Sequence, residues 1–245
     1  MPLAAINDPV ATITHAVAAI AFAIFAVPLV RRGRGSPVRR ASLIVFAATA
    51  VLLLTASATF HALPSGTAGR AVLQRVDHAA IFLLIAGTFT GIHGILFTGP
   101  LRWGVLTFIW IGAAAGIVLK TIFFDTFPEA LGISLYLAMG WVGALTMIAV
   151  WRLHGGRHTV QLIAAGLAYT VGAVFEFTGW PTIVPGVIGP HDAFHIAVIV
   201  GLGIFWMFIY QIAGEIPPRK ACPAQNANEL PISGADPLPS GHAGA

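Results

Sequence analysis

Long apolar segments separated by short polar connections dominate this chain. Seven such runs can be read along it, and each approaches the roughly 20 residues that a helix needs to cross about 30 Å of hydrocarbon. Backbone polar groups in lipid must be satisfied within each segment, so continuous apolar runs favour helices over the alternating strands of a barrel. The pattern predicts an all-α integral membrane protein, a bundle of seven transmembrane helices. The runs cover residues 13–30, 41–62, 77–97, 103–122, 130–151, 160–178 and 192–213.

The connections between the runs divide the chain into two parts. They are short and carry Gly, Pro or Arg, which predicts one compact bundle with sequential helices in contact. We therefore expect residues 1–213 to form a seven-helix membrane domain. Residues 214–245 are rich in Pro, Ala, Gly and Asn without an apolar period, which predicts a disordered tail.

Composition agrees with a membrane protein. The 245 residues are 57% hydrophobic and 9% charged, whereas a soluble domain carries about 25% charged residues. The single cysteine, Cys222, excludes a disulfide framework within one chain and makes a thiolate metal cluster implausible. The net charge of +4 comes largely from basic residues between the apolar runs, which favours a role in membrane orientation over nucleic-acid binding. Membrane lipid is therefore the expected partner.

The distribution of Lys and Arg predicts the orientation. Three lie on the side of the N-terminus and ten on the other side, so the positive-inside rule places the N-terminus outside and the tail in the cytoplasm. The three are Arg70, Arg75 and Lys120; the ten are Arg31, Arg32, Arg34, Arg39, Arg40, Arg102, Arg152, Arg157, Arg219 and Lys220.

Chemically versatile side chains stand at the ends of several apolar runs. Ser57 and His61 close the second run, Asp77 opens the third, and His191 and His195 open the last. Because successive spans alternate in direction, these ends lie on one side of the membrane and at similar depth. Ionisable groups near lipid are costly and need a reason.

The spacing of these residues favours a metal site. His191 and His195 are four residues apart, a good arrangement for two ligands on one helix. His61 would complete three protein ligands and leave a fourth position for water, the composition of a catalytic zinc site. Asp77 could act as general base, and Ser57 could support a ligand or a substrate carbonyl.

Two further residues share this side. Glu176 ends the sixth run and is interpreted as a substrate or proton contact, with reach into the lipid headgroups as the alternative. His15, near the start of the first run, is expected to line the approach to the site. Simpler interpretations stay open: Asp77 could pair with Arg75, Ser57 could hydrogen-bond its own helix, and single histidines could anchor the interface.

At these residues the chain resembles the hemolysin III family, the bacterial branch of the progestin and adipoQ receptor family. The resemblance extends from Asp8 to Tyr210. It departs from the family pattern at Gly91, where proline is usual, and at Glu176, where an aromatic or neutral residue is common. The segments that carry it are ITHAVAA (13–19), SATFHAL (57–63), RVDHAAIFLLIAGTFT (75–90), YLAMGW (136–141), YTVGAVF (169–175) and HDAFH (191–195).

The resemblance implies a seven-helix bundle in a bacterial plasma membrane with a zinc ion near one surface. His61, His191 and His195 would be its ligands, Asp77 would hold the zinc-bound water, and Ser57 would be the associated hydroxyl. The wider superfamily looks like membrane-embedded hydrolases of lipid amides such as ceramides. The receptors of the family are held to have a cytoplasmic N-terminus, which is the opposite of the orientation that the Lys and Arg count predicts.

Three functions follow as hypotheses. The first is a zinc-dependent membrane hydrolase that cleaves a lipid amide or ester through an activated water. The second is a membrane receptor or regulator in which zinc is structural. The third is a cytolytic channel, which should show a polar stripe through several spans; the runs at 103–122 and 130–151 have almost none at mid-depth.

Overall fold

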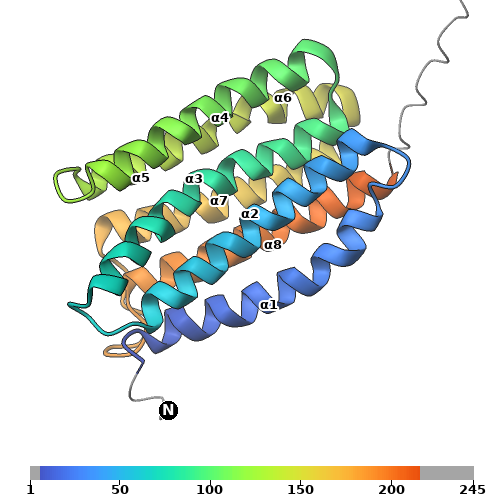
Figure 1. Ribbon diagram of the computed structural model, residues 1–245. Helices are drawn as coiled ribbons and strands as arrows, with labels where there is room; N and C mark the ends of the chain where they lie inside the picture. The colour runs from blue at the N-terminus through green and yellow to red at the C-terminus, as the bar shows by residue number, and fades with distance from the viewer. Residues whose placement is uncertain (1–5, 216–245) are drawn as a thin grey trace, which may run out of the picture.

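The computed structural model describes residues 6–215 as a bundle of helices that run roughly side by side (Figure 1). Seven helical spans are long and apolar enough to cross a membrane, which confirms the predicted all-α class. Within the described residues the β-structure is one isolated bridge between Val184 and Ile188. The helices are α1 (Pro9–Arg31), α2 (Pro37–Ala62), α3 (Ala68–Leu96), α4 (Gly99–Ile122), α5 (Glu129–Trp141), α6 (Gly143–His154), α7 (Gly156–Thr178) and α8 (Pro190–Glu215).

Local capping signals set the beginnings of several helices. The side chains of Ser36 and Thr67 accept hydrogen bonds from the backbone N–H groups of Arg39 and Arg70, each at 3.3 Å. Helix α3 therefore begins at Ala68, well before the apolar run that opens at residue 77. The first turns of α3 are helical but polar. Hydropathy did not reveal them, because it reports which residues suit lipid and not which residues are helical.

The closest packing joins α2 to α3 through small residues. A Cβ added at Gly87 would collide with Thr49, and one added at Gly94 would collide with Ser42. Close approach of two backbones at glycine is the usual way to pack helices in lipid, where no hydrophobic force draws them together. Helices α1 and α8 complete a core with α2 and α3 around aromatic residues such as Phe46.

The fifth span packs loosely and is interrupted. It consists of α5 and α6, which are separated at Val142. Of its apolar stretch 11% is buried, against 78% for α3. The expected contact between sequential helices therefore holds closely for α1 to α4 and for α7 with α8, and more weakly around α5 and α6. The loose packing leaves room for a cavity beside α3, α7 and α8.

The predicted boundary at residue 213 falls near the end of α8, which extends to Glu215. The disordered tail predicted for residues 214–245 lies, from residue 216 onward, outside the described part of the chain. The cytoplasmic placement of that tail stays a prediction.

Candidate metal centre

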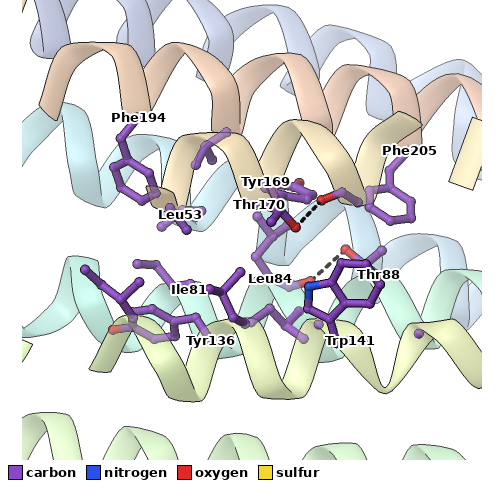
Figure 2. A pocket seen from close by; sticks show the side chains of 18 of the residues that line it. Leu53, Ile81, Leu84, Thr88, Tyr136, Trp141, Tyr169, Thr170, Phe194 and Phe205 are labelled. Atoms are coloured by element: carbon purple, nitrogen blue, oxygen red, sulfur yellow. Dashed lines mark hydrogen bonds between the residues drawn. The ribbon is translucent and has the colours of Figure 1, made fainter. Parts of the chain in front are cut away.

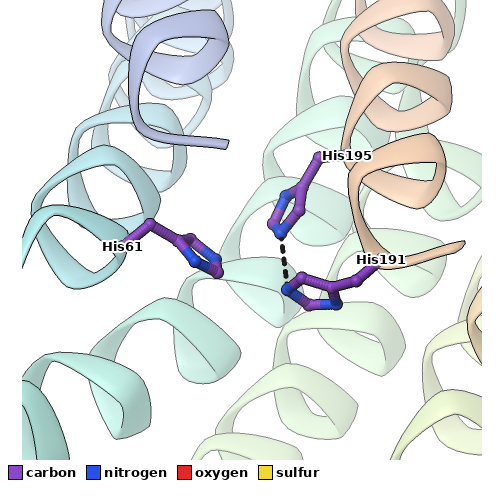
Figure 3. A group of neighbouring side chains, drawn as sticks. All are labelled: His61, His191 and His195. Carbon is purple, nitrogen blue, oxygen red and sulfur yellow. Dashed lines mark hydrogen bonds between the residues drawn. The ribbon is translucent and has the colours of Figure 1, made fainter. Parts of the chain in front are cut away.

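Three imidazole rings from two distant helices meet at one end of the bundle (Figure 3). His61 comes from α2, and His191 and His195 come from α8; one ligand nitrogen of each lies within 4.8 Å of the others. The ring centroid of His61 lies 5.2 Å from that of His191 and 4.7 Å from that of His195. Within the described residues 6–215, this is the group of His, Cys, Asp or Glu side chains whose geometry can hold a metal ion.

The helix ends explain why these rings converge. His61 lies in the last turn of α2, whereas α8 begins at Pro190, so His191 and His195 stand one turn apart on its first two turns. The backbone N–H of Asp8 donates to the carbonyl of His61 at 3.1 Å, which fixes the start of α1 against the end of α2. Alternation of the spans therefore brings the starts of α1 and α8 and the end of α2 to one place.

Carboxylates orient two of the three rings. His61 Nδ1 lies 3.0 Å from Asp8 Oδ2, and His191 Nδ1 lies 3.0 Å from both carboxylate oxygens of Glu176. A carboxylate that accepts the Nδ1 proton fixes the tautomer and frees Nε2 as a basic ligand atom, as is usual behind metal-binding histidines. Both rings thus have the outer support that a metal site requires.

A fourth histidine supports the remaining ring. His195 Nδ1 lies 3.2 Å from His15 Nε2, and the two rings meet edge to face with centroids 4.5 Å apart. Both side chains are buried. When Nε2 of His195 serves as the ligand atom, its Nδ1–H donates to His15.

The positions of the imidazole Nε2 atoms fit a bound metal ion. His61 Nε2 is buried and, within the described residues, has no hydrogen-bond partner. The Nε2 atoms of His191 and His195 lie 2.9 Å apart. Two imidazole ligands of a tetrahedral zinc ion lie about 3.3 Å apart, so small ring movements would suffice. Imidazoles suit zinc and several other transition metals, so the donor set does not by itself decide which one binds.

Asp8 is a site residue that the sequence analysis did not single out. Its carboxylate also accepts a hydrogen bond of 2.8 Å from Arg70 Nη2. Partial burial alone would raise the pKa of Asp8, but the hydrogen bonds from Arg70 and His61 outweigh it and lower that pKa to about 2. Asp8 therefore stays charged behind His61. The sequence offered one indication of this role: Asp8 stands just before the first apolar run, on the same side of the membrane as the other candidates.

Asp77 and Ser57 lie beside the histidines on the wall of one cavity, and both are buried. Arg75 pairs with Asp125 at 2.7 Å, which argues against an ion pair between Arg75 and Asp77. Ser57 Oγ does not bond its own helix backbone and lies within reach of the Asp77 carboxylate. The structure thus brings together the five residues first proposed for the site.

Glu176 and His15 lie at the site, and their expected contacts with a substrate stay predictions. Both border the cavity, but each is directed at a ligand histidine, Glu176 at His191 and His15 at His195. Their contacts are those of residues that hold the rings in place. His15 is 1% exposed, and its expected place along the approach stays a prediction.

A cavity of about 390 Å³ extends from His191 and His195 into the bundle. Figure 2 shows part of its wall. Asp77, His191 and His195 border its polar part, and most of the remaining wall is aliphatic or aromatic. Binding sites for small molecules are commonly apolar cavities of this size with a few convergent polar groups. The labelled apolar side chains in Figure 2 include Leu53, Ile81, Leu84, Phe194 and Phe205.

Seven membrane-spanning helices with three histidines that can hold a metal ion define the class of protein. Residues 3–206 match the family described as haemolysin-III related, and the chain belongs to this hemolysin III family. Hemolysin-3 of Bacillus cereus is 32% identical over 167 residues, which cover 66% of this chain and 74% of that protein. The hemolysin-3 homolog of Bacillus subtilis (strain 168) is 31% identical over 134 residues, 55% of this chain and 62% of that protein.

Glu176 provides a test of the outer support. Replacement by glutamine removes the charge that holds the Nδ1 proton of His191, so we expect metal affinity to fall about 10-fold. Competition against a chelating dye measures this affinity. Glu215→Gln is the matched control, because Glu215 contacts His158 instead of the cluster. Equal affinities of the two variants would show that Glu176 does not support the site.

Proposed function

We propose that this protein is a zinc-dependent membrane hydrolase that cleaves a lipid amide or ester. The observation that carries the proposal is the position of the three-histidine cluster, of which His191 and His195 border an apolar cavity beside Asp77. A site with three protein ligands and one open position is the usual composition of a catalytic zinc centre. A structural zinc normally has four protein ligands.

The chemistry divides among a few residues. Zinc held by three imidazoles would lower the pKa of a coordinated water towards 7 and polarise a carbonyl. Asp77 would accept the proton of the attacking water and return it to the nitrogen or oxygen of the leaving group. Ser57 Oγ, buried beside Asp77, would donate a hydrogen bond to the carbonyl oxygen. Water adds to the acyl carbon, the C–N or C–O bond breaks, and a carboxylic acid is released.

The cavity supports a lipid as the substrate. Its wall is mainly apolar and would hold an acyl chain while excluding bulk water from the cluster. Trp141 of α5 and Leu167 of α7 both border the cavity and are 51% exposed on the surface of the bundle. The loosely packed fifth span therefore offers a route by which a lipid enters from the side.

A structural metal in a receptor or regulator is the second candidate. It is favoured by one observation: the three ligands join the end of α2 to the start of α8, so a bound ion would fasten two helices together. Under that hypothesis metal removal lowers thermal stability without any chemical activity to lose.

The decisive experiment measures release of fatty acid by the purified full chain. The substrates are a panel of ceramides, N-acylethanolamines, N-acylglycines, lysophosphatidic acid and neutral ester lipids in mixed micelles, with detection by mass spectrometry. We expect turnover of at least one lipid class, loss of turnover on treatment with a chelator, and recovery when zinc is restored. Zinc-loaded protein that hydrolyses none of these lipids, yet melts at a lower temperature without metal, would favour the structural role.

A further inference from the structure

A buried lysine borders the same cavity on its α4 and α5 side. Lys120 lies in the last turn of α4 and is 3% exposed. Gly116, one turn earlier, packs against the ring of Phe82 on α3. This register places Lys120 close to the level of His78, the residue next to Asp77. The lysine and the metal centre therefore lie near the same end of the cavity.

Two aromatic rings and the backbone of a glycine surround the ammonium group of Lys120. Lys120 Nζ lies 5.3 Å from the ring centroid of Phe124 and 5.6 Å from that of Phe127, within the range of cation–π contact. A Cβ built on Gly132 of α5 would lie 2.6 Å from Lys120 Cε and 2.9 Å from Nζ. The end of the lysine thus passes directly over Gly132, and a side chain at that position would displace the ammonium group.

No carboxylate in the described part of the chain forms a contact ion pair with this cation. The ion pairs within residues 6–215 include none with Lys120. Asp125, close in sequence, pairs with Arg75 at 2.7 Å. Glu129 borders the cavity and attracts Lys120 electrostatically, but it is exposed and forms no contact ion pair with the lysine. Charged side chains inside a membrane protein are costly, and they usually pair with another charge or serve a ligand.

We propose that Lys120 binds the anionic head group, a carboxylate or a phosphate, of a lipid whose acyl chain lies in the cavity. The inference rests on the proposed function in taking this cavity as the lipid site. It adds that the head group of the preferred lipid is negatively charged. The acidic group lies at the Lys120 side, while the acyl carbonyl faces the histidines. An acyl amide whose amine portion bears an acid has this chemistry.

The test is equilibrium binding of radiolabelled lipids to the full chain in a non-ionic detergent with a chelator present. The chelator prevents a metal ion from holding the anion instead of Lys120. The probes are N-palmitoylglycine, palmitoyl lysophosphatidic acid and the neutral N-palmitoylethanolamine, which share one acyl chain. We expect at least one acidic probe to bind about 10-fold more tightly than the neutral probe. The tighter of the two acidic probes identifies the head group as carboxylate or phosphate.

Variants separate the lysine from general surface charge. Lys120→Met and Gly132→Ala, which displaces the ammonium group, should each reduce the preference to about twofold or less. Binding of the neutral probe should persist in both variants and reports an intact cavity. Gly132→Ala keeps the test valid if Lys120→Met does not fold. Arg152→Met, which removes an exposed cation in the last turn of α6, should leave the preference unchanged.

The outcomes distinguish this inference from the proposed function. Equal binding of acidic and neutral probes by the wild-type chain, or full preference in Lys120→Met, would overturn the role of Lys120. Preference for an acidic probe in a chain that hydrolyses no lipid would overturn the hydrolase and leave Lys120 as the anchor of a bound acidic lipid. Hydrolysis of neutral lipids by a chain that shows no preference for an acidic probe would support the hydrolase and overturn the role of Lys120.

Discussion

His195→Ala is expected to reduce the metal content of the purified protein from about one ion per chain to less than about 0.1, because two imidazoles remain for an ion that needs three protein ligands. His195 is 5% exposed and lies between the other two site histidines and His15, so no water-exposed side chain can take its place without rearrangement. Elemental analysis by mass spectrometry, with a cobalt absorption spectrum as a second readout, measures the loss.

The control for that experiment is His158→Ala. This imidazole belongs to α7 and contacts Glu215 near the opposite end of the bundle, at 3.2 Å. The His158→Ala variant therefore lacks one histidine outside the cluster, and its metal content should equal that of the wild type. A full metal complement in His195→Ala would disprove the proposed centre.

Asp77→Asn is expected to lower turnover by about 10²- to 10⁴-fold while metal content stays unchanged. Asparagine has nearly the same shape but cannot accept the proton of the attacking water. Asp77 is not among the three residues that converge on the ion, which is why binding should survive. The comparison needs the turnover number on the best lipid found and an elemental analysis of the same preparation.

Asp125→Asn is the matched control for Asp77. Asp125 forms an ion pair with Arg75 at the surface, so its amide should change turnover by less than about twofold. Wild-type turnover in Asp77→Asn would remove the general base from the mechanism. Under a purely structural metal, His195→Ala would lower the melting temperature and Asp77→Asn would change nothing.

The architecture was predictable from the sequence because hydropathy alone reveals spans in lipid. The limits of the helices were not, since the polar first turns of α3 lie outside the lipid pattern although they are helical. Nor could the pattern show that α5 and α6 pack loosely. An apolar side chain suits a lipid-facing surface and a helix interface equally well.

The three site histidines were predictable from depth and spacing, because alternation of spans places His61 beside the start of α8. Their outer partners were harder to predict. Asp8 contacts His61 across 53 positions in sequence, a pairing that no local pattern announces. Lys120 was counted as a helix-end charge that reports orientation, and its burial against Gly132 follows only from how α4 meets α5.

The hydrogen bond between Asp8 and His61 has a practical consequence for purification. Any sequence fused directly ahead of Asp8 is joined to the chain within a few residues of the metal centre. A polyhistidine tag placed there would offer competing imidazoles at high local concentration and could strip or duplicate the ion being assayed. Affinity handles for metal quantification therefore belong after Glu215, at the far end of the last helix.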